Sequence, residues 1–226
     1  MMAVTGAGFL VGLIAGMGAD VWLRRRRYRY DDERDLRLLN TGWLIAVLPF
    51  AVGLIVAGWW QLSIPTAILL SGYCIVLGVL AAIDLDVRRL PDAITLPLIP
   101  VTLAGVVVVA VMENALGDAW RAVQAGLALG AFYFVQVLIG RGAGMGLGDA
   151  KLAVSLGLAC GLLSWPHVFV STLAAYLSAL LLGGILMLAR RAGRKTEIAF
   201  GPHMALGAAI VFCAPGAFAL VTGALG

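Results

Sequence analysis

Charged side chains are scarce in this 226-residue chain: they make up 12% of it, whereas hydrophobic residues make up 62%. Soluble domains carry roughly 25% charged and about 45–50% apolar residues, so the composition excludes an ordinary soluble domain. It also excludes a disordered chain, which needs low hydrophobicity and high net charge. Cysteine is rare as well. Cys74, Cys160 and Cys213 lie singly inside apolar stretches, a pattern that supports neither a disulfide framework nor a zinc site.

Long apolar runs take up most of the sequence. A bilayer core of ~30 Å is crossed by about 20 helical residues, and the runs are continuously apolar, unlike the alternating strands of a β-barrel. We therefore predict an all-α, polytopic membrane protein with about eight transmembrane helices and a single domain over residues 1–226. The predicted spans are Val4–Leu23, Trp43–Trp60, Thr66–Ile83, Ala93–Met112, Ala122–Ile139, Ala150–Leu163, His167–Ala189 and His203–Leu225.

The basic residues predict how these spans are oriented. Every lysine and arginine except Arg121 lies beside one of the alternate connections that follow the first, third, fifth and seventh spans. Basic loops stay in the cytoplasm, so both termini are predicted outside. The net charge of +4 is then a topology signal, and we expect the lipid bilayer and no nucleic acid as a partner. Residues 24–37 mix arginines with acidic residues and are predicted to form a solvated loop or short helix, with substrate docking as the alternative.

Carboxylates at the membrane edge are the candidate functional groups, because such groups are energetically costly and are functional by default. Asp84 directly continues the apolar run of the third span. Asp86 lies about 200° further around the helix and is predicted to be a solvated neighbour. Asp92 follows Pro91 and precedes a new apolar run, which predicts a helix cap.

A second candidate, Asp149, follows a stretch in which glycines alternate with other residues from Gly142 to Gly148. Such a loop could hold an extended peptide against Asp149; alternatively, Asp149 is the N-cap of the sixth helix. The predicted sixth span covers only ~21 Å, so either the bilayer thins locally or the Asp149 end lies below the membrane surface in a wet cavity, which favours a functional role. Lys151 either tunes Asp149 electrostatically or anchors the helix at the interface.

Two carboxylates without nearby histidines or thiols indicate acid–base chemistry on water. If they lie close together, they share one proton: the ionised carboxylate accepts a proton from water and the protonated one polarises a carbonyl. We therefore predict no metal ion and no cofactor. The sequence spacing does not establish that Asp84 and Asp149 meet.

At these residues the chain resembles the type IV prepilin peptidase family, membrane aspartyl proteases of the G-x-G-D class. The matching motifs are Asp84 with Leu90-Pro91-Asp92 and Thr95-Leu96-Pro97-Leu98, Gly146-Leu147-Gly148-Asp149-Ala150-Lys151-Leu152, and Phe200-Gly201-Pro202. The resemblance implies cleavage of the basic leader of prepilins or pseudopilins at the cytoplasmic face of a bacterial inner membrane. It implies that Asp84 and Asp149 are catalytic. We expect Gly146, Gly148, Lys151, Pro91 and Asp92 to support the site or bind substrate.

One departure from the family concerns residues 24–42. Many members carry a cysteine-rich insertion at this place that is associated with methylation of the new N-terminus, whereas this interval contains no cysteine. We therefore expect a peptidase without N-methyltransferase activity. Two alternatives remain: a proton-coupled transporter, which also uses buried carboxylates, and a non-catalytic component of pilus or secretion machinery.

Overall fold

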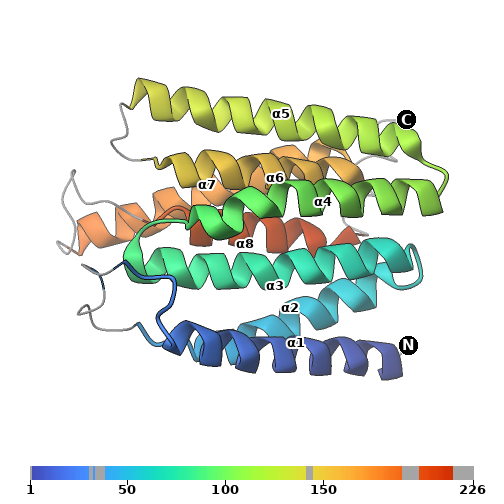
Figure 1. The fold of residues 1–226 in the computed structure, drawn as a ribbon, viewed down its shortest axis with the longest axis horizontal. Coiled ribbons are helices and arrows are strands. Elements are labelled where there is room, and N and C mark those ends of the chain that lie inside the picture. Colours follow the sequence, from blue (N-terminus) through green and yellow to red (C-terminus); the bar gives the residue numbers. More distant parts are fainter. Residues whose placement is uncertain (1, 31–32, 34–38, 141–144, 190–198, 216–226) are drawn as a thin grey trace.

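The computed structural model describes residues 2–30, 33, 39–140, 145–189 and 199–215. These residues form eight helices and no strand. Figure 1 shows the helices running back and forth along one long axis, as a bundle. They are α1 (Met2–Arg24), α2 (Trp43–Trp59), α3 (Ile64–Val87), α4 (Asp92–Met112), α5 (Leu116–Ile139), α6 (Leu147–Leu163), α7 (Trp165–Leu188) and α8 (Gly201–Phe212).

Five of the described helices are long and apolar enough to cross a membrane: α1, α3, α4, α5 and α7. The other two apolar helices, α2 and α8, are shorter, with 17 and 12 residues. Large apolar side chains on the outside of the bundle stay exposed, among them Phe50, Leu180 and Leu188. This combination confirms an all-α, polytopic membrane protein, because apolar surface of this extent is stable only against lipid.

Each predicted span coincides with a helix, and the boundaries differ where local capping decides them. α3 begins two residues before the predicted Thr66 because the Ser63 hydroxyl accepts a hydrogen bond from the Thr66 amide at 3.0 Å.

α5 begins at Leu116, six residues before the predicted Ala122. This earlier start places Arg121 on the helix, where its guanidinium donates to the carbonyls of Gly161, Leu162 and Leu163. Arg121 thus satisfies the last carbonyls of α6, which no intrahelical donor reaches.

The predicted last span, His203–Leu225, is wrong at its start and in its described length. α8 begins at Gly201 and ends at Phe212, shortly before Pro215. Proline lacks the amide hydrogen that a continuing helix needs. The predicted remainder, 216–225, lies outside the described residues.

α6 lies in the interior of the bundle, and most of its residues are buried. It packs closely on α5 because two of its glycines leave room for the α5 backbone. A Cβ on Gly157 would lie 2.5 Å from the Ala125 carbonyl oxygen, and one on Gly161 would lie 2.5 Å from the Ala125 Cβ. Small residues at such contacts allow helices to approach each other within a membrane.

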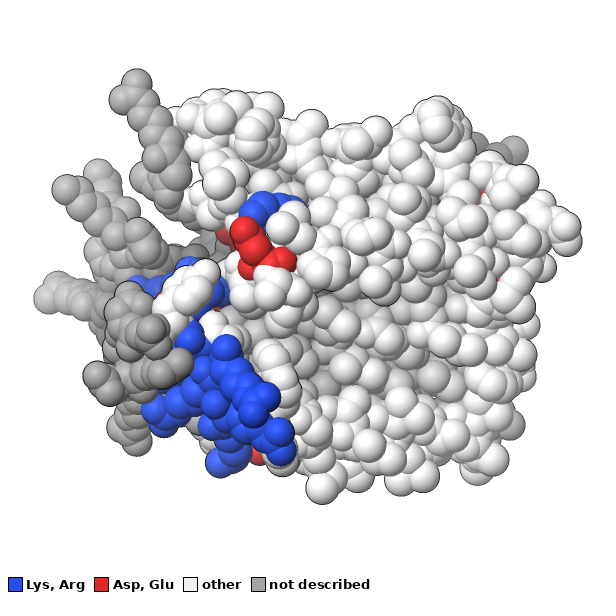
Figure 2. All heavy atoms as spheres, in the orientation of Figure 1, with Lys and Arg blue, Asp and Glu red and all other residues white. Residues whose placement is uncertain are grey.

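In Figure 1, α1, α3, α5 and α7 end at one end of the bundle, and α2, α4, α6 and α8 begin there. Figure 2 shows that the charged side chains on this face gather at that same end, while the rest of the face carries almost none. The N-terminus lies at the opposite end. The described bundle thus has one charged end, while the side of the membrane on which it lies stays a prediction.

Candidate active site

Asp84 lies in the last turn of α3. The helix ends because Arg88 adopts a left-handed conformation (φ 52°), after donating its amide hydrogen to the Asp84 carbonyl at 2.8 Å. The Asp84 residue is only 4% exposed. Its Oδ2 accepts a hydrogen bond from the backbone amide of Gly201, at the start of α8, at 2.8 Å. The free amide of a helix N-terminus thus stabilises the carboxylate.

Asp149 is the third residue of α6. Its Oδ2 accepts a hydrogen bond from the Gly146 amide at 3.0 Å, and its own amide donates to the Gly146 carbonyl at 3.1 Å. Gly146 is therefore the N-cap of α6. The predicted start of the helix at Ala150 is wrong, and so is the prediction that Asp149 is its N-cap. A carboxylate at the third helical position reaches back to the N-cap amide, as in a capping box. Asp149 is 8% exposed.

The bundle brings the two aspartates together. Asp84 and Asp149 lie within range of an electrostatic interaction with each other, although they come from α3 and α6. Like charges held near each other in a buried setting disfavour double ionisation. Such a pair can remove a proton from water and donate one to a carbonyl oxygen, which is the chemistry of amide hydrolysis.

Gly148 fixes how α6 begins relative to the connection between α3 and α4. A Cβ on Gly148 would lie 2.8 Å from the Leu90 Cβ and 3.2 Å from its carbonyl oxygen. A Cβ on Gly146 would meet nothing nearer than 3.6 Å, its own neighbour Asp149. Of the two glycines predicted to support the site, only Gly148 is required by a close approach. Residues 141–144 of the predicted glycine loop lie outside the described residues.

Lys151 and Asp92 pair with each other at the rim. The Lys151 Nζ lies 2.7 Å from the Asp92 Oδ1, a contact that was not predicted; the two roles predicted for Lys151 stay predictions. Asp92 was predicted to be a helix cap, and this is wrong: Pro91 is the N-cap of α4 and Asp92 is its first residue. The Asp92 side chain is 60% exposed, so the pair ties α4 to α6 at the surface.

Sequence reasoning missed the aromatic side chains beside Asp149. Tyr133 on α5 is fully buried and interacts electrostatically with Asp149, as does Tyr176 on α7. Phe200 packs on both rings, with centroid distances of 5.9 Å to Tyr133 and 5.2 Å to Tyr176. Single aromatic residues in apolar helices carry no pattern that distinguishes them from core residues. Gly201 follows Phe200 directly, so the ring that packs on Tyr133 and Tyr176 and the amide that bonds to Asp84 belong to adjacent residues.

The comparison with known families agrees with this geometry. The model of the type IV leader peptidase family matches residues 71–188, just over half of the chain. The chain belongs to the type IV leader peptidase family. The matched range contains Asp84 and Asp149, whereas Gly201 lies beyond it. Comparisons with curated proteins and with solved structures gave no significant match.

In this leader peptidase family member Asp86 is no solvated neighbour, and that prediction is wrong. The Asp86 and Arg29 side chains form an ion pair and are both 0% exposed. Arg29 donates through Nε at 2.9 Å and through Nη2 at 2.8 Å, while the Tyr28 hydroxyl and the Leu39 amide donate at 2.6 and 3.1 Å. Burial and the hydrogen bond to Asp86 raise the pKa of Tyr28 to about 12. Four hydrogen-bond donors contact the Asp86 carboxylate, so Asp86 anchors Tyr28, Arg29 and Leu39 to the end of α3.

The segment 24–37, predicted as a solvated loop or short helix, contacts the end of α3 in its described part. The Arg89 guanidinium pairs with Glu33 at 2.6 Å and stacks over the Tyr30 ring at 3.7 Å. Its hydrogen bond to Glu33 holds the pKa of that carboxyl below its usual range. These contacts were not predicted, because Asp86 and Arg89 are distant in sequence from this segment. Residues 31–32 and 34–38 lie outside the described part.

Metal ligands do not gather around the aspartates in the described part of the chain. No group of three or more histidine, cysteine, aspartate or glutamate residues there could hold a metal ion. The two histidines bond to serines: His167 Nδ1 lies 2.7 Å from the Ser164 hydroxyl, and His203 Nδ1 lies 2.9 Å from the Ser178 hydroxyl. The groups near Asp84 and Asp149 are thus backbone amides and aromatic rings.

Proposed function

We propose that this protein is a membrane-embedded aspartyl endopeptidase that removes the basic leader of type IV prepilins or pseudopilins. Asp84 and Asp149 form the catalytic pair. The observation that carries the proposal is that two buried carboxylates, one from α3 and one from α6, interact electrostatically within a chain of the type IV leader peptidase family. The charged end of the bundle faces the cytoplasm of a bacterial inner membrane, all eight helices cross or enter the bilayer, and both termini are outside.

Each carboxylate of the pair accepts a hydrogen bond from one backbone amide. Each Oδ2 is already occupied by one amide donor, from Gly201 for Asp84 and from Gly146 for Asp149. The ionised carboxylate removes a proton from the attacking water, and the protonated carboxylate donates to the carbonyl oxygen of the scissile bond. As the tetrahedral intermediate collapses, the carboxylic acid that took the proton of water gives it to the leaving amine, and the other carboxylate takes a proton from a hydroxyl of the intermediate, so the pair is restored.

The absence of a cysteine-rich insertion from residues 24–42 supports a peptidase that does not methylate its product. In its place, the described part of this segment is a short anchor on Asp86 and Arg89. We expect the mature substrate to leave with a free, unmethylated N-terminus.

The test is direct. The purified protein in liposomes is incubated with candidate prepilins, and the product is examined by N-terminal sequencing and intact mass. We expect one cut at the end of the basic leader and no added methyl group. A protein that cleaves none of the candidates would refute the peptidase and leave the transporter or the non-catalytic component. A methyl group that depends on this chain alone would refute the second claim.

A further inference from the structure

The hydroxyl of Tyr133 on α5 is buried beside the proposed catalytic pair and has no hydrogen-bond partner among the described residues. The residue is 0% exposed, and it interacts electrostatically with the Asp149 carboxylate and with Tyr176. The Tyr176 hydroxyl donates its own hydrogen to Gln136 Oε1 at 2.8 Å. A buried hydroxyl that donates to no acceptor costs free energy. Such groups are rare in native proteins, and a catalytic role is one of the explanations for them.

Two aromatic rings hold the Tyr133 ring in place. Its centroid lies 5.9 Å from that of Tyr176 and 5.9 Å from that of Phe200. The phenol oxygen moves with its ring, and only the hydrogen on it rotates freely. The packed ring therefore restricts which acceptors the hydroxyl reaches, and Asp149 is the charged acceptor with which it interacts.

The two carboxylates of the pair differ in their hydroxyl neighbours. Each accepts one hydrogen bond from a backbone amide, Asp84 from Gly201 and Asp149 from Gly146. The amides alone therefore treat the two carboxylates alike. No hydroxyl of a described residue bonds to Asp84, whereas Tyr133 interacts with Asp149. The Tyr133 hydroxyl thus makes the pair asymmetric.

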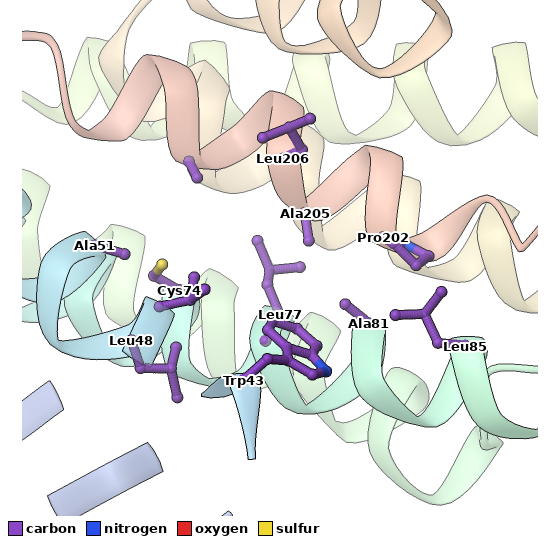
Figure 3. Close-up of a pocket in the computed structure, with 13 residues that line it drawn as sticks. Trp43, Leu48, Ala51, Cys74, Leu77, Ala81, Leu85, Pro202, Ala205 and Leu206 are labelled. Carbon is purple, nitrogen blue, oxygen red and sulfur yellow. The ribbon is translucent and has the colours of Figure 1, made fainter. Parts of the chain in front are cut away.

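The groove between α2, α3 and α8 adds no polar group for Asp84. Figure 3 shows Leu85 and Pro202 in its lining, and these residues follow Asp84 and Gly201 in the sequence. None of the described residues that line the groove carries a hydroxyl or a charged side chain. In the described part of the chain, the tyrosines that interact with the pair come from α5 and α7, and both interact with Asp149.

We infer that Tyr133 is a positioning residue that donates a hydrogen bond to the Asp149 carboxylate during the reaction and makes Asp149 the base of the pair. The inference rests on the proposed function. A hydrogen bond to an ionised carboxylate favours the ionised form. Asp149 then takes the proton of the attacking water, Asp84 gives its proton to the scissile carbonyl oxygen, and the Tyr133 hydroxyl keeps its hydrogen. Hydrogen bonds in active sites are often long before substrate binds and shorten in the substrate complex.

The experiment removes the Tyr133 oxygen and keeps its ring. Tyr133→Phe should lower kcat for a leader substrate at least tenfold and change KM less than twofold, because the buried hydroxyl acts through Asp149 and does not contact the substrate. The matched control is Tyr73→Phe. Tyr73 is also a buried tyrosine, and its hydroxyl lies 2.9 Å from the Ser155 hydroxyl. We expect kcat of Tyr73→Phe to stay within twofold of wild type at matched membrane abundance.

The stabilities of the two variants should follow the opposite order. Tyr133→Phe removes a hydroxyl without a hydrogen-bond partner among the described residues, so its denaturant midpoint should equal or exceed that of wild type. Tyr73→Phe breaks a buried hydrogen bond, so its midpoint should fall. A Tyr133→Phe protein that loses stability and activity together would assign its hydroxyl to structure and overturn the inference.

The pH profile of kcat tests the role given to Asp149. Tyr133→Phe should move the acidic limb to higher pH, because the ionised base loses a donor. The variant leaves unchanged the other titratable groups on the elements packed against α6, which are Asp84 on α3, Tyr176 on α7, His203 on α8 and the ion pair of Asp92 with Lys151. An acidic limb that stays in place, or moves to lower pH, overturns the inference.

A second variant covers a Tyr133→Phe protein that folds poorly. Tyr133→fluorotyrosine keeps the hydroxyl and makes it a stronger donor, so the acidic limb should move to lower pH. An unmoved limb overturns the inference. If wild type cleaves a leader substrate and Tyr133→Phe keeps its kcat, the inference fails and the peptidase proposal stands. If wild type cleaves no leader substrate, the proposed function fails and the inference fails with it.

Discussion

Gly201 is the residue on which the Asp84 carboxylate depends most directly. Its amide donates to Asp84 Oδ2, and a Cβ at this position would lie 2.9 Å from the same oxygen. An added methyl group must therefore displace the carboxylate that its own backbone holds. The sequence indicated Gly201 only as part of a family resemblance, because no local pattern connects a glycine to an aspartate 117 positions away.

Gly201→Ala should reduce kcat at least tenfold while the protein still inserts and folds, since the substitution acts on one carboxylate and not on helix packing. Gly184→Ala on α7 is the control, because a Cβ there would meet nothing within 4 Å. Steady-state cleavage of a leader substrate measures the effect. Wild-type kcat in Gly201→Ala would mean that the Asp84 position tolerates displacement.

The two glycines before Asp149 give a second contrast at the residue scale. Gly148→Ala should lose most activity, because a Cβ 2.8 Å from the Leu90 Cβ pushes the start of α6 away from the α3–α4 connection. Gly146→Ala should retain activity, because its Cβ finds only ordinary contacts and its amide still bonds to Asp149. The measurement is kcat for both variants at matched membrane abundance. Equal loss in the two would point to loop flexibility as the requirement.

At the scale of the elements, the sequence predicted the existence of the helices well and their ends less well. Continuous apolar runs predict spans because the bilayer imposes a length. The start of α6 was predicted wrongly because an aspartate is common both at the N-cap and at the third position of a helix, so the sequence does not distinguish the two. The hydrogen bond from the Gly146 amide to Asp149 shows that Asp149 is at the third position. The contacts of residues 28–30 and 33 with the end of α3 were missed because they depend on Asp86 and Arg89, far along the chain.

The anchor between Arg29 and Asp86 predicts a loss of stability when it is broken. Asp86→Asn should lower the free energy of unfolding by about 3 kcal/mol, because it leaves the buried Arg29 guanidinium without its counter-charge. Asp92→Asn breaks an exposed ion pair with Lys151 and should cost about 0.5 kcal/mol. Denaturant unfolding in detergent micelles measures both. Equal costs would contradict the anchoring role of Asp86.

At the scale of the whole molecule, the charged end of the bundle and the two aspartates belong together. The motif residues of α3, α6 and α8 lie near one another because α3 ends where α6 and α8 begin. The sequence predicted this end from its basic residues, since topology is encoded by local composition. It did not predict that Asp84 and Asp149 meet, because helix order within a bundle depends on packing such as that of Gly157 and Gly161 against α5.

Reporter fusions test the predicted topology. Fusions after Arg89 and Arg141 should report the cytoplasm, and fusions after Gln61 and Asp118 the exterior, because the basic residues are retained on one side. The measurement uses a reporter pair with opposite compartment requirements. An exterior signal after Arg141 with a cytoplasmic one after Arg89 would place the two aspartates on opposite sides and contradict a shared site.

The measurement that tests the central claim most directly is cleavage of one leader substrate by Asp84→Asn and Asp149→Asn, with Asp92→Asn as the matched control at the same end of the bundle. Asparagine keeps the size and the hydrogen-bond acceptor for the Gly201 or Gly146 amide but cannot exchange a proton. Asp84 and Asp149 have different protonation roles in a shared pair, so each substitution alone should remove nearly all cleavage at unchanged membrane abundance, while Asp92→Asn keeps most of it. Full activity in either Asp84→Asn or Asp149→Asn would contradict the paired mechanism.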